Sequence, residues 1–221
     1  MRINKYIDHT VLKAIATEAD IIKLCKEARE YKFFSVCINE SYVSIAKKEL
    51  EGSDVKIAVV IGFPLGAMSK DAKIFEAKKC IEDGADEIDM VINIGFLKDG
   101  KFDEVESEIR EIKETIGTHI LKVIHENCYL TDAEKRKACE LSVSAGADFV
   151  KTSTGFGTGG STFEDVALMK EVVGNKAQIK AAGGVRDIET AMKYIEMGVT
   201  RLGTSSGVSL VSTGKAKEDE Y

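Results

Sequence analysis

The stretch AGADFVK, residues 145–151, places a helix stop directly before a buried strand. Gly146 can adopt the left-handed conformation in which helices commonly end, and the short apolar run after it is typical of a buried strand. The same phrase returns as DGADEID at 83–89 and as MGVTRLG at 197–203. A helix-to-strand junction that recurs along one chain indicates repeated βα units.

The rest of the chain repeats this alternation. Charged segments with apolar residues at i, i+3, i+4 and i+7 separate the apolar runs, and this spacing predicts amphipathic helices. Thr17 and Thr162 each precede such a segment and are followed three residues later by an acid, which is typical of a helix start. The predicted strands are 5–10, 33–39, 56–62, 87–93, 120–126, 149–153, 178–182 and 201–205, and the predicted helices are 16–31, 69–84, 102–117, 131–146, 162–174 and 187–198.

Uninterrupted alternation predicts an α/β fold, a single-domain (β/α)₈ TIM barrel. A doubly wound open sheet is the alternative, but it usually has fewer strands and a clear switch point. Pro64 is the one proline and no Ser/Pro-rich linker is present, so we expect no domain boundary. The predicted barrel spans 1–210, and 211–221 is predicted to be a polar, flexible tail.

Composition excludes several classes of protein. The 221 residues carry a formal charge of −6, which argues against a nucleic-acid partner. No apolar run approaches the roughly 20 residues of a membrane span, and the first residues lack a signal-peptide pattern. Five scattered cysteines without a CxxC pair indicate reduced thiols, hence a cytoplasmic protein. The three histidines form no HxH or HExxH pattern, so we expect no metal site.

Three lysines inside predicted strands are unusual. Chemistry in a barrel lies at the carboxyl ends of the strands, and burying an ammonium there is costly without a partner. A single lysine in a strand can instead face outward with its ammonium in water. We favour a functional interpretation for the set that shares the barrel mouth: Lys122, Lys151 and Lys180, together with Asp89.

This set suits Schiff-base catalysis. A lysine attacks a carbonyl only as the free amine, and its ordinary pKa of about 10.4 leaves little amine at neutral pH. Lys151 and Lys180 lie on consecutive strands, so each ammonium is expected to disfavour charging of the other. Asp89 is placed to move protons. Lys122 is expected to pair with Asp89 or Glu126.

Glycine-rich turns follow three of the strands. Glycine lets backbone N–H groups approach an anion, and phosphate sites after strands 7 and 8 are common in barrels. The turns GTGGS (157–161), AAGGVRD (181–187) and GTSSGVS (203–209) therefore predict a phosphate site, with the candidate ligands Gly183, Gly184, Ser205 and Ser206.

A dinucleotide site is the alternative for these glycines. Gly155, Gly157 and Gly160 form a literal GxGxxG between a strand and a helix. The dinucleotide motif also requires an acid at the end of the next strand, where this chain has Lys180, and it belongs in a first βαβ unit. We therefore disfavour this interpretation.

Taken together, YIDHTVLK, EIDMVIN, FVKTSTGFGTGG, KAAGG and RLGTSSG resemble the 2-deoxyribose-5-phosphate aldolases, a class I aldolase family on a (β/α)₈ barrel. The similarity runs from Tyr6 to Val208. It implies reversible cleavage of 2-deoxy-D-ribose 5-phosphate to D-glyceraldehyde 3-phosphate and acetaldehyde, without metal or organic cofactor. It also implies a role in deoxynucleotide catabolism, which is usual in the family.

The resemblance assigns roles to individual residues. Lys151 matches the lysine that forms the Schiff base, Lys180 the lysine that tunes it, and Asp89 the aspartate that acts with water in proton transfer. The glycine and serine turns match the phosphate loops, and Thr152 is a further predicted substrate contact. Cys37 is either a reactive thiol at the mouth or a small core residue. Tyr221 either reaches the site from the tail, as in some members, or is a solvated end.

Three departures from the family pattern bear on affinity. Ala182 replaces a usual serine near the phosphate, and in HEN (125–127) His125 and Asn127 stand where an aliphatic residue and often a threonine are expected. We expect His125 to face the helices. Two other functions stay open: a class I aldolase with a different aldehyde or ketone donor, and a sugar-phosphate-binding barrel without turnover. A homodimer or a homotetramer is the expected assembly.

Overall fold

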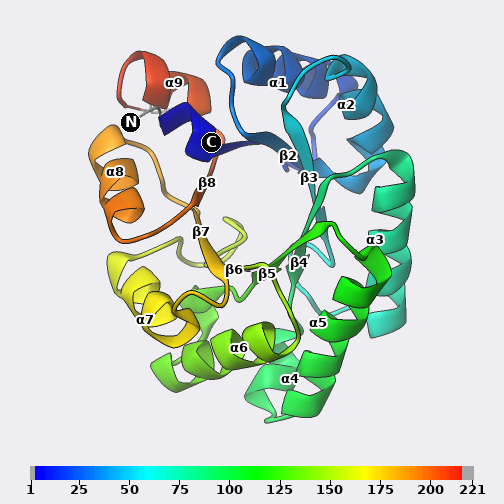
Figure 1. The fold of residues 1–221 in the computed structure, drawn as a ribbon, viewed down its shortest axis with the longest axis vertical. Helices are drawn as coiled ribbons and strands as arrows, with labels where there is room; N and C mark the ends of the chain where they lie inside the picture. Colours follow the sequence, from blue (N-terminus) through cyan, green and yellow to red (C-terminus); the bar gives the residue numbers. More distant parts are fainter. Residues whose placement is uncertain (1–2, 216–221) are drawn as a thin grey trace.

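The chain forms a closed barrel of eight parallel strands, each hydrogen-bonded to the next in chain order, with β1 completing the circle against β8 (Figure 1). This computed structural model describes residues 3–215. The strands are β1 (Ile7–Thr10), β2 (Ser35–Asn39), β3 (Lys56–Ile61), β4 (Glu87–Val91), β5 (Ile120–Ile124), β6 (Phe149–Lys151), β7 (Gln178–Ala182) and β8 (Arg201–Thr204). The predicted fold is confirmed.

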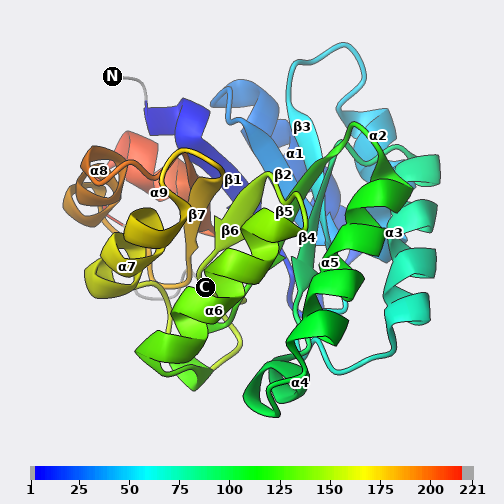
Figure 2. The same cartoon turned by 60° about the horizontal axis from the view of Figure 1, so that its bottom comes forward.

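Helices surround the barrel as an outer layer (Figures 1 and 2). They are α1 (Glu18–Glu30), α2 (Val43–Glu49), α3 (Lys70–Asp83), α4 (Ile94–Lys98), α5 (Phe102–Ile116), α6 (Asp132–Ser144), α7 (Phe163–Val173), α8 (Ile188–Glu196) and α9 (Gly207–Ser212), with single 3₁₀ turns at Ile3–Tyr6, Glu40–Tyr42 and Asn127–Tyr129. None of the helices between residues 3 and 215 is both long and apolar enough to cross a membrane.

All six predicted helices are present, and their starts follow the predicted chemistry. Thr17 and Thr162 each accept a hydrogen bond from the backbone N–H three residues later. The prediction missed α2, α4 and α9, which have 7, 5 and 6 residues. Helices this short show less than two full turns of periodicity, so their apolar spacing is not distinctive.

The strands divide their side chains between two surroundings. Along β4, Ile88 and Met90 point outward and share an apolar cluster with Ile109 and Ile112 of α5. The alternate residues of β4 point into the barrel, because successive side chains of a strand face opposite sides. The outer layer therefore supplies most of the apolar core, and the lumen is left available for polar groups.

The barrel extends slightly past its predicted end. Helix α9 continues through Ser212, and Asp187 forms an isolated antiparallel bridge with Lys215. The first residues of the predicted tail are therefore packed on the barrel at the start of α8. The rest of that segment, including Tyr221, lies outside the described residues.

Candidate active site

A cavity of about 410 Å³ opens at the carboxyl ends of the strands. The loops after β1, β6, β7 and β8 enclose it, as expected for a barrel site. We call it the mouth cavity. Among the predicted site residues, those that line it are Lys151, Gly183, Gly184, Ser205 and Ser206.

The two predicted lysines lie side by side inside the barrel. Lys151 and Lys180 are paired in register on β6 and β7. Both donate to the same carboxylate oxygen, with 2.8 Å from each Nζ to Asp89 Oδ2. Lys180 Nζ also lies 2.6 Å from Asp8 Oδ2. Lys151 lines the mouth cavity, whereas Lys180 and Asp89 are fully buried behind it.

Asp89 is the common partner of three lysine side chains. Its second oxygen, Oδ1, accepts a hydrogen bond of 2.6 Å from Lys122 Nζ. Burial by itself raises the pKa of this carboxyl, but Lys122, Lys151 and Lys180 together outweigh burial and hold the pKa well below its usual value. Asp89 is therefore ionised at neutral pH. Lys122 pairs with Asp89, the first of its two predicted partners.

The pKa values of the two lysines move in opposite directions. Burial lowers the pKa of Lys151, the charge of Lys180 lowers it further, and Asp89 opposes both. Lys180 is equally buried, but Asp8 and Asp89 outweigh burial and raise its pKa. These two directions are the ones that a reactive amine beside a protonated lysine requires. Burial is the larger cause, however, whereas the sequence-based hypothesis gave that place to the neighbouring charge.

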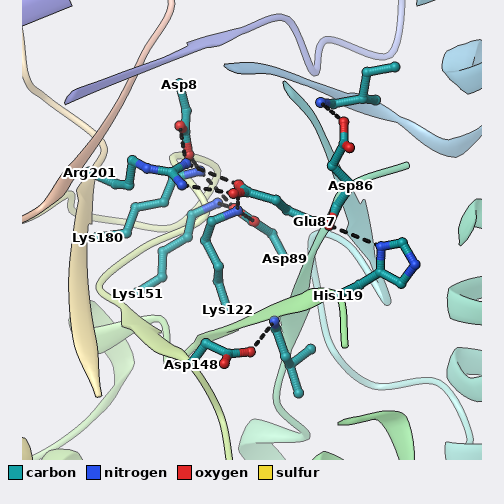
Figure 3. Close-up of polar contacts among 12 residues, drawn as sticks. Asp8, Asp86, Glu87, Asp89, His119, Lys122, Asp148, Lys151, Lys180 and Arg201 are labelled. Atoms are coloured by element: carbon teal, nitrogen blue, oxygen red, sulfur yellow. Dashed lines mark hydrogen bonds and ion pairs between the residues drawn. The ribbon is translucent and has the colours of Figure 1, made fainter. Parts of the chain in front are cut away.

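Below these residues lies a second layer of charge that the sequence analysis did not predict. Arg201 donates to both oxygens of Glu87 at 2.7 and 3.0 Å and to Asp8 Oδ1 at 2.8 Å. Glu87 Oε2 is also 2.7 Å from Lys122 Nζ. Figure 3 shows these side chains converging on the barrel axis. We call the closed, alternating circuit the ionic ring, in the order Asp8, Lys180, Asp89, Lys122, Glu87 and Arg201.

Charge in the ionic ring is balanced. Its three carboxylates face three cations, and each ring member contacts the next. Among the contacts within residues 3–215, Lys151 is attached to the ring through Asp89. Charging Lys151 would add a fourth cation in a region shielded from water, where an unbalanced charge is costly. The neutral amine of Lys151 is the state that leaves this group of side chains uncharged as a whole.

The glycine turns after β7 shape the opposite wall of the mouth cavity. Gly183 and Gly184 have φ of 81° and 85°, a conformation that favours glycine. The turn of Gly160 packs on Gly183 so closely that a Cβ at Gly160 would lie 2.2 Å from Gly183 O. Backbone at this wall is thus exposed to a ligand, as a phosphate site requires. Arg186, which was not predicted, also lines the cavity.

Thr152 does not line the mouth cavity. Its hydroxyl donates to Ala182 O at 3.2 Å and accepts from Ala182 N at 3.1 Å. Lys151 points into the barrel, so the next residue points away from it. The predicted substrate contact is therefore replaced by a structural one that holds β6 against β7.

The contacts of three other residues decide between the roles or orientations predicted for them. Cys37 is buried in the barrel, and burial raises the pKa of its thiol, which matches the small core residue of the two alternatives. His125 faces the helices as expected, with Nε2 2.9 Å from Ser142 Oγ of α6. Glu126 does not pair with Lys122, because its carboxylate accepts hydrogen bonds from the backbone and hydroxyl of Thr154.

A signal for the missed residues was present in the sequence. Asp8, Glu87 and Arg201 are charged residues of the predicted strands 5–10, 87–93 and 201–205, the same anomaly that pointed to the lysines. Glu87 and Asp89 are also two apart, so they face the same side of β4. Within residues 3–215, no group of His, Cys, Asp or Glu side chains is arranged to hold a metal ion.

Comparison with known proteins places this geometry in context. Residues 2–210 match the sequence model of the DeoC/LacD family aldolases. The chain is 58% identical to deoxyribose-phosphate aldolase of Finegoldia magna over 96% of this chain and 99% of that protein. The Clostridium tetani enzyme of the same name is 57% identical, with 97% and 100% covered. The tetrameric deoxyribose phosphate aldolase structure from Aeropyrum pernix superposes with a TM-score of 0.86 at 32% identity, covering 96% of this chain and 90% of that one.

Proposed function

The chain belongs to the DeoC/LacD family of aldolases, and we propose that it reversibly cleaves 2-deoxy-D-ribose 5-phosphate to D-glyceraldehyde 3-phosphate and acetaldehyde. The observation that carries the proposal is the placement of Lys151. Its side chain lines the mouth cavity and contacts Asp89 of the charge-balanced ionic ring, and burial lowers its pKa. An uncharged amine at a cavity wall is the group that an imine-forming aldolase needs.

The chemistry starts at Lys151 Nζ. The amine adds to C1 of the open-chain sugar, and loss of water gives a protonated imine. The C3 hydroxyl then loses its proton as the C2–C3 bond breaks, so glyceraldehyde 3-phosphate leaves and the bonding electrons form an enamine. Protonation of the enamine at C2 and addition of water release acetaldehyde and restore the amine. No outside oxidant or reductant is consumed.

Proton transfer is divided among the residues behind Lys151. Lys180 has a raised pKa and remains protonated, so it can donate to the departing hydroxyl of the first adduct. Asp89 is a weak base while Lys122, Lys180 and the protonated imine of Lys151 surround it. Its basicity rises when Lys151 becomes the uncharged enamine, because one of these positive charges is then gone. We assign proton transfer with water to Asp89 at that stage.

The phosphate of the substrate binds at the opposite wall. Backbone N–H groups of Gly183 and Gly184 and the hydroxyls of Ser205 and Ser206 supply the contacts, and Arg186 lies on the same cavity. We expect Ser205→Ala to raise KM for 2-deoxyribose 5-phosphate severalfold and to leave turnover of unphosphorylated 2-deoxyribose unchanged. Equal effects on the two sugars would place the phosphate elsewhere.

Borohydride trapping with acetaldehyde tests the function directly. Reduction at pH 7 should fix a two-carbon adduct on Lys151, identified by peptide mass, and turnover of 2-deoxyribose 5-phosphate should be abolished with it. The absence of an adduct would remove the imine mechanism. An adduct formed only with larger ketones would favour a class I aldolase with another donor, and binding without turnover would favour the sugar-phosphate-binding barrel.

Three further expectations belong to the same proposal. We infer that Tyr221 assists proton transfer from the tail, which predicts a loss of turnover when it is deleted. We infer a homodimer or a homotetramer, since the Aeropyrum pernix relative is a tetramer, and light scattering measures this. We place the enzyme in the cytoplasm, in the breakdown of deoxynucleosides, because all five cysteines are free thiols.

A further inference from the structure

We propose that the Arg201–Glu87 ion pair is a positioning element of the site, which sets the protonation state of Lys151 without touching the mouth cavity. The inference rests on the proposed function, because it concerns the amine that forms the imine. Neither Arg201 nor Glu87 lines the cavity. Both stand at the first position of their strands, β8 and β4, and therefore at the barrel end away from the substrate.

The pair is held rigidly. Arg201 and Glu87 make two parallel contacts of 2.7 and 3.0 Å, a bidentate geometry that fixes both side chains. The guanidinium stacks on Phe34, with Cζ 3.3 Å from the ring centroid, and the same Cζ lies 5.5 Å from the ring centroid of Phe149. Arg201 is 5% exposed and Glu87 is 3% exposed, so water screens their charges weakly.

Two chains of contacts connect this pair to the nucleophile. Arg201 holds Asp8, which contacts Lys180, and Glu87 holds Lys122. Both chains end at Asp89, the carboxylate beside Lys151. Lys151, Lys180 and Arg201 are also in register across β6, β7 and β8. Two strand spacings of about 4.8 Å thus separate Arg201 from Lys151, or roughly 10 Å.

The charge balance of the ionic ring predicts in which direction the loss of each charge moves the protonation of Lys151. Lys151 is faced by Asp89 from β4, Lys180 from β7 and the thiol of Cys37 from β2. The thiol has a raised pKa and stays neutral. Removing the charge of Arg201 leaves the ionic ring one cation short, which favours a proton on Lys151. Removing the charge of Glu87 leaves the ring one anion short, which favours the free amine.

The experiment measures the rate of acetaldehyde adduct formation by borohydride trapping across pH. We expect Arg201→Gln to move the midpoint of this profile to higher pH and Glu87→Gln to move it to lower pH. Two charges about 10 Å apart in a medium of effective dielectric about 20 couple by on the order of one pH unit. At pH 7 this is a loss of up to about tenfold in trapping rate for Arg201→Gln.

Two variants separate charge from packing. Arg201→Lys keeps the charge and loses the bidentate contact, so its midpoint should stay at the wild-type value. The double variant Glu87→Gln/Arg201→Gln removes one charge of each sign, so its midpoint should return toward wild type. Glu108→Gln, which changes a buried acid of the helix layer, is the matched control and should leave the profile in place. Thermal unfolding by circular dichroism verifies that each variant is folded.

The outcomes are distinct. Shifts of the two single variants in the same direction, or unmoved midpoints with uniformly lower rates, would show that the pair only supports the fold and would overturn the inference. If one Gln variant fails to fold, the other still decides, because a midpoint that stays in place or moves in the direction opposite to the expected one contradicts the proposal. The absence of an adduct in the wild-type enzyme would instead contradict the proposed function itself.

Discussion

Two buried lysines of this molecule, Lys151 and Lys73, both have a lowered pKa. They differ in their access to the mouth cavity and in their neighbours. Lys151 belongs to the barrel interior and Lys73 to α3 in the helix layer. Burial is the largest cause of the lowered pKa in both. Lys73 is enclosed completely, and a Cβ on the underlying Gly62 would lie 2.7 Å from its Cε. A low pKa therefore does not by itself mark a nucleophile.

The difference lies in access and in neighbours. Lys73 donates to Val91 O and lies 2.8 Å from Glu108 Oε1, and it lines neither the mouth cavity nor the smaller cavity beside α6 and α7. In the part of the chain that the structure describes, Lys151 has one carboxylate partner, which it shares with Lys180, and its side chain lines the cavity. Lys151, which lies among other positive charges, thus has access to the cavity. Lys73, which pairs with Glu108, is enclosed by the helix layer.

The largest effect is expected when each lysine is replaced by methionine. Lys151→Met should reduce turnover of 2-deoxyribose 5-phosphate by at least about a thousandfold, because the imine cannot form. Lys73→Met should retain turnover within about threefold in the fraction that remains folded. Steady-state kinetics on both variants checks this, and comparable losses would mean that the contrast between the two lysines is false.

The second effect concerns the neighbouring charge. Lys180→Leu removes an ammonium that disfavours protonation of Lys151, so the pKa of Lys151 should rise and the pH optimum of adduct formation should move alkaline. We expect a loss of about tenfold or more in trapping rate at pH 7. A pH series of borohydride trapping measures it. An optimum that stays in place would show that Lys180 does not tune the amine.

The third effect is on stability in the helix layer. Lys73→Met leaves Glu108 buried without its cation, which should lower the free energy of unfolding by about 3 kcal/mol. The double variant Lys73→Met/Glu108→Leu should recover most of that loss, since no lone charge remains. Urea unfolding of the three proteins gives the comparison. If the double variant is no more stable than the single one, packing rather than charge dominates at this position.

The smallest effect is a pH dependence of stability. Burial raises the pKa of Glu108 above 4.5 in the folded chain, although Lys73 opposes the shift. The folded state then binds the proton more tightly than the unfolded state, so this contribution is full below pH 4.5 and is lost as pH rises through the folded pKa. Relative to Glu108→Gln, the wild type should lose about 1 kcal/mol or less across this range. Urea unfolding midpoints of the wild type and of Glu108→Gln, measured between pH 4 and pH 7, test this. A difference between the two proteins that does not change with pH, or that changes in the opposite direction, would contradict the prediction.

Much of the fold and part of the site were predictable because their signals are local. A glycine stop such as Gly146 followed by an apolar run reports a junction that is formed by neighbouring residues. Lys151 and Lys180 were identifiable because consecutive strands of a barrel are neighbours and strand ends form the mouth. The glycine turn at Gly183 and Gly184 was placed by the same rule.

The remainder depends on distances that no local pattern encodes. Arg201 meets Glu87, 114 residues away, because β4 and β8 face each other across a lumen that exists only in the closed barrel. The loss of the predicted role for Thr152 has a simpler cause. Alternation along β6 turns it away from the cavity once Lys151 points in.

The contact between Asp8 and Arg201 joins the first strand to the last, across 193 residues. A partly synthesised chain that ends before β8 contains Lys151, Lys180 and Asp89 but lacks the guanidinium that completes their surroundings. Because the ionic ring of such a fragment is one cation short, we expect it to form the aldehyde adduct more slowly than the complete chain. The surroundings of the reactive amine are therefore complete only after the last strand has joined the first.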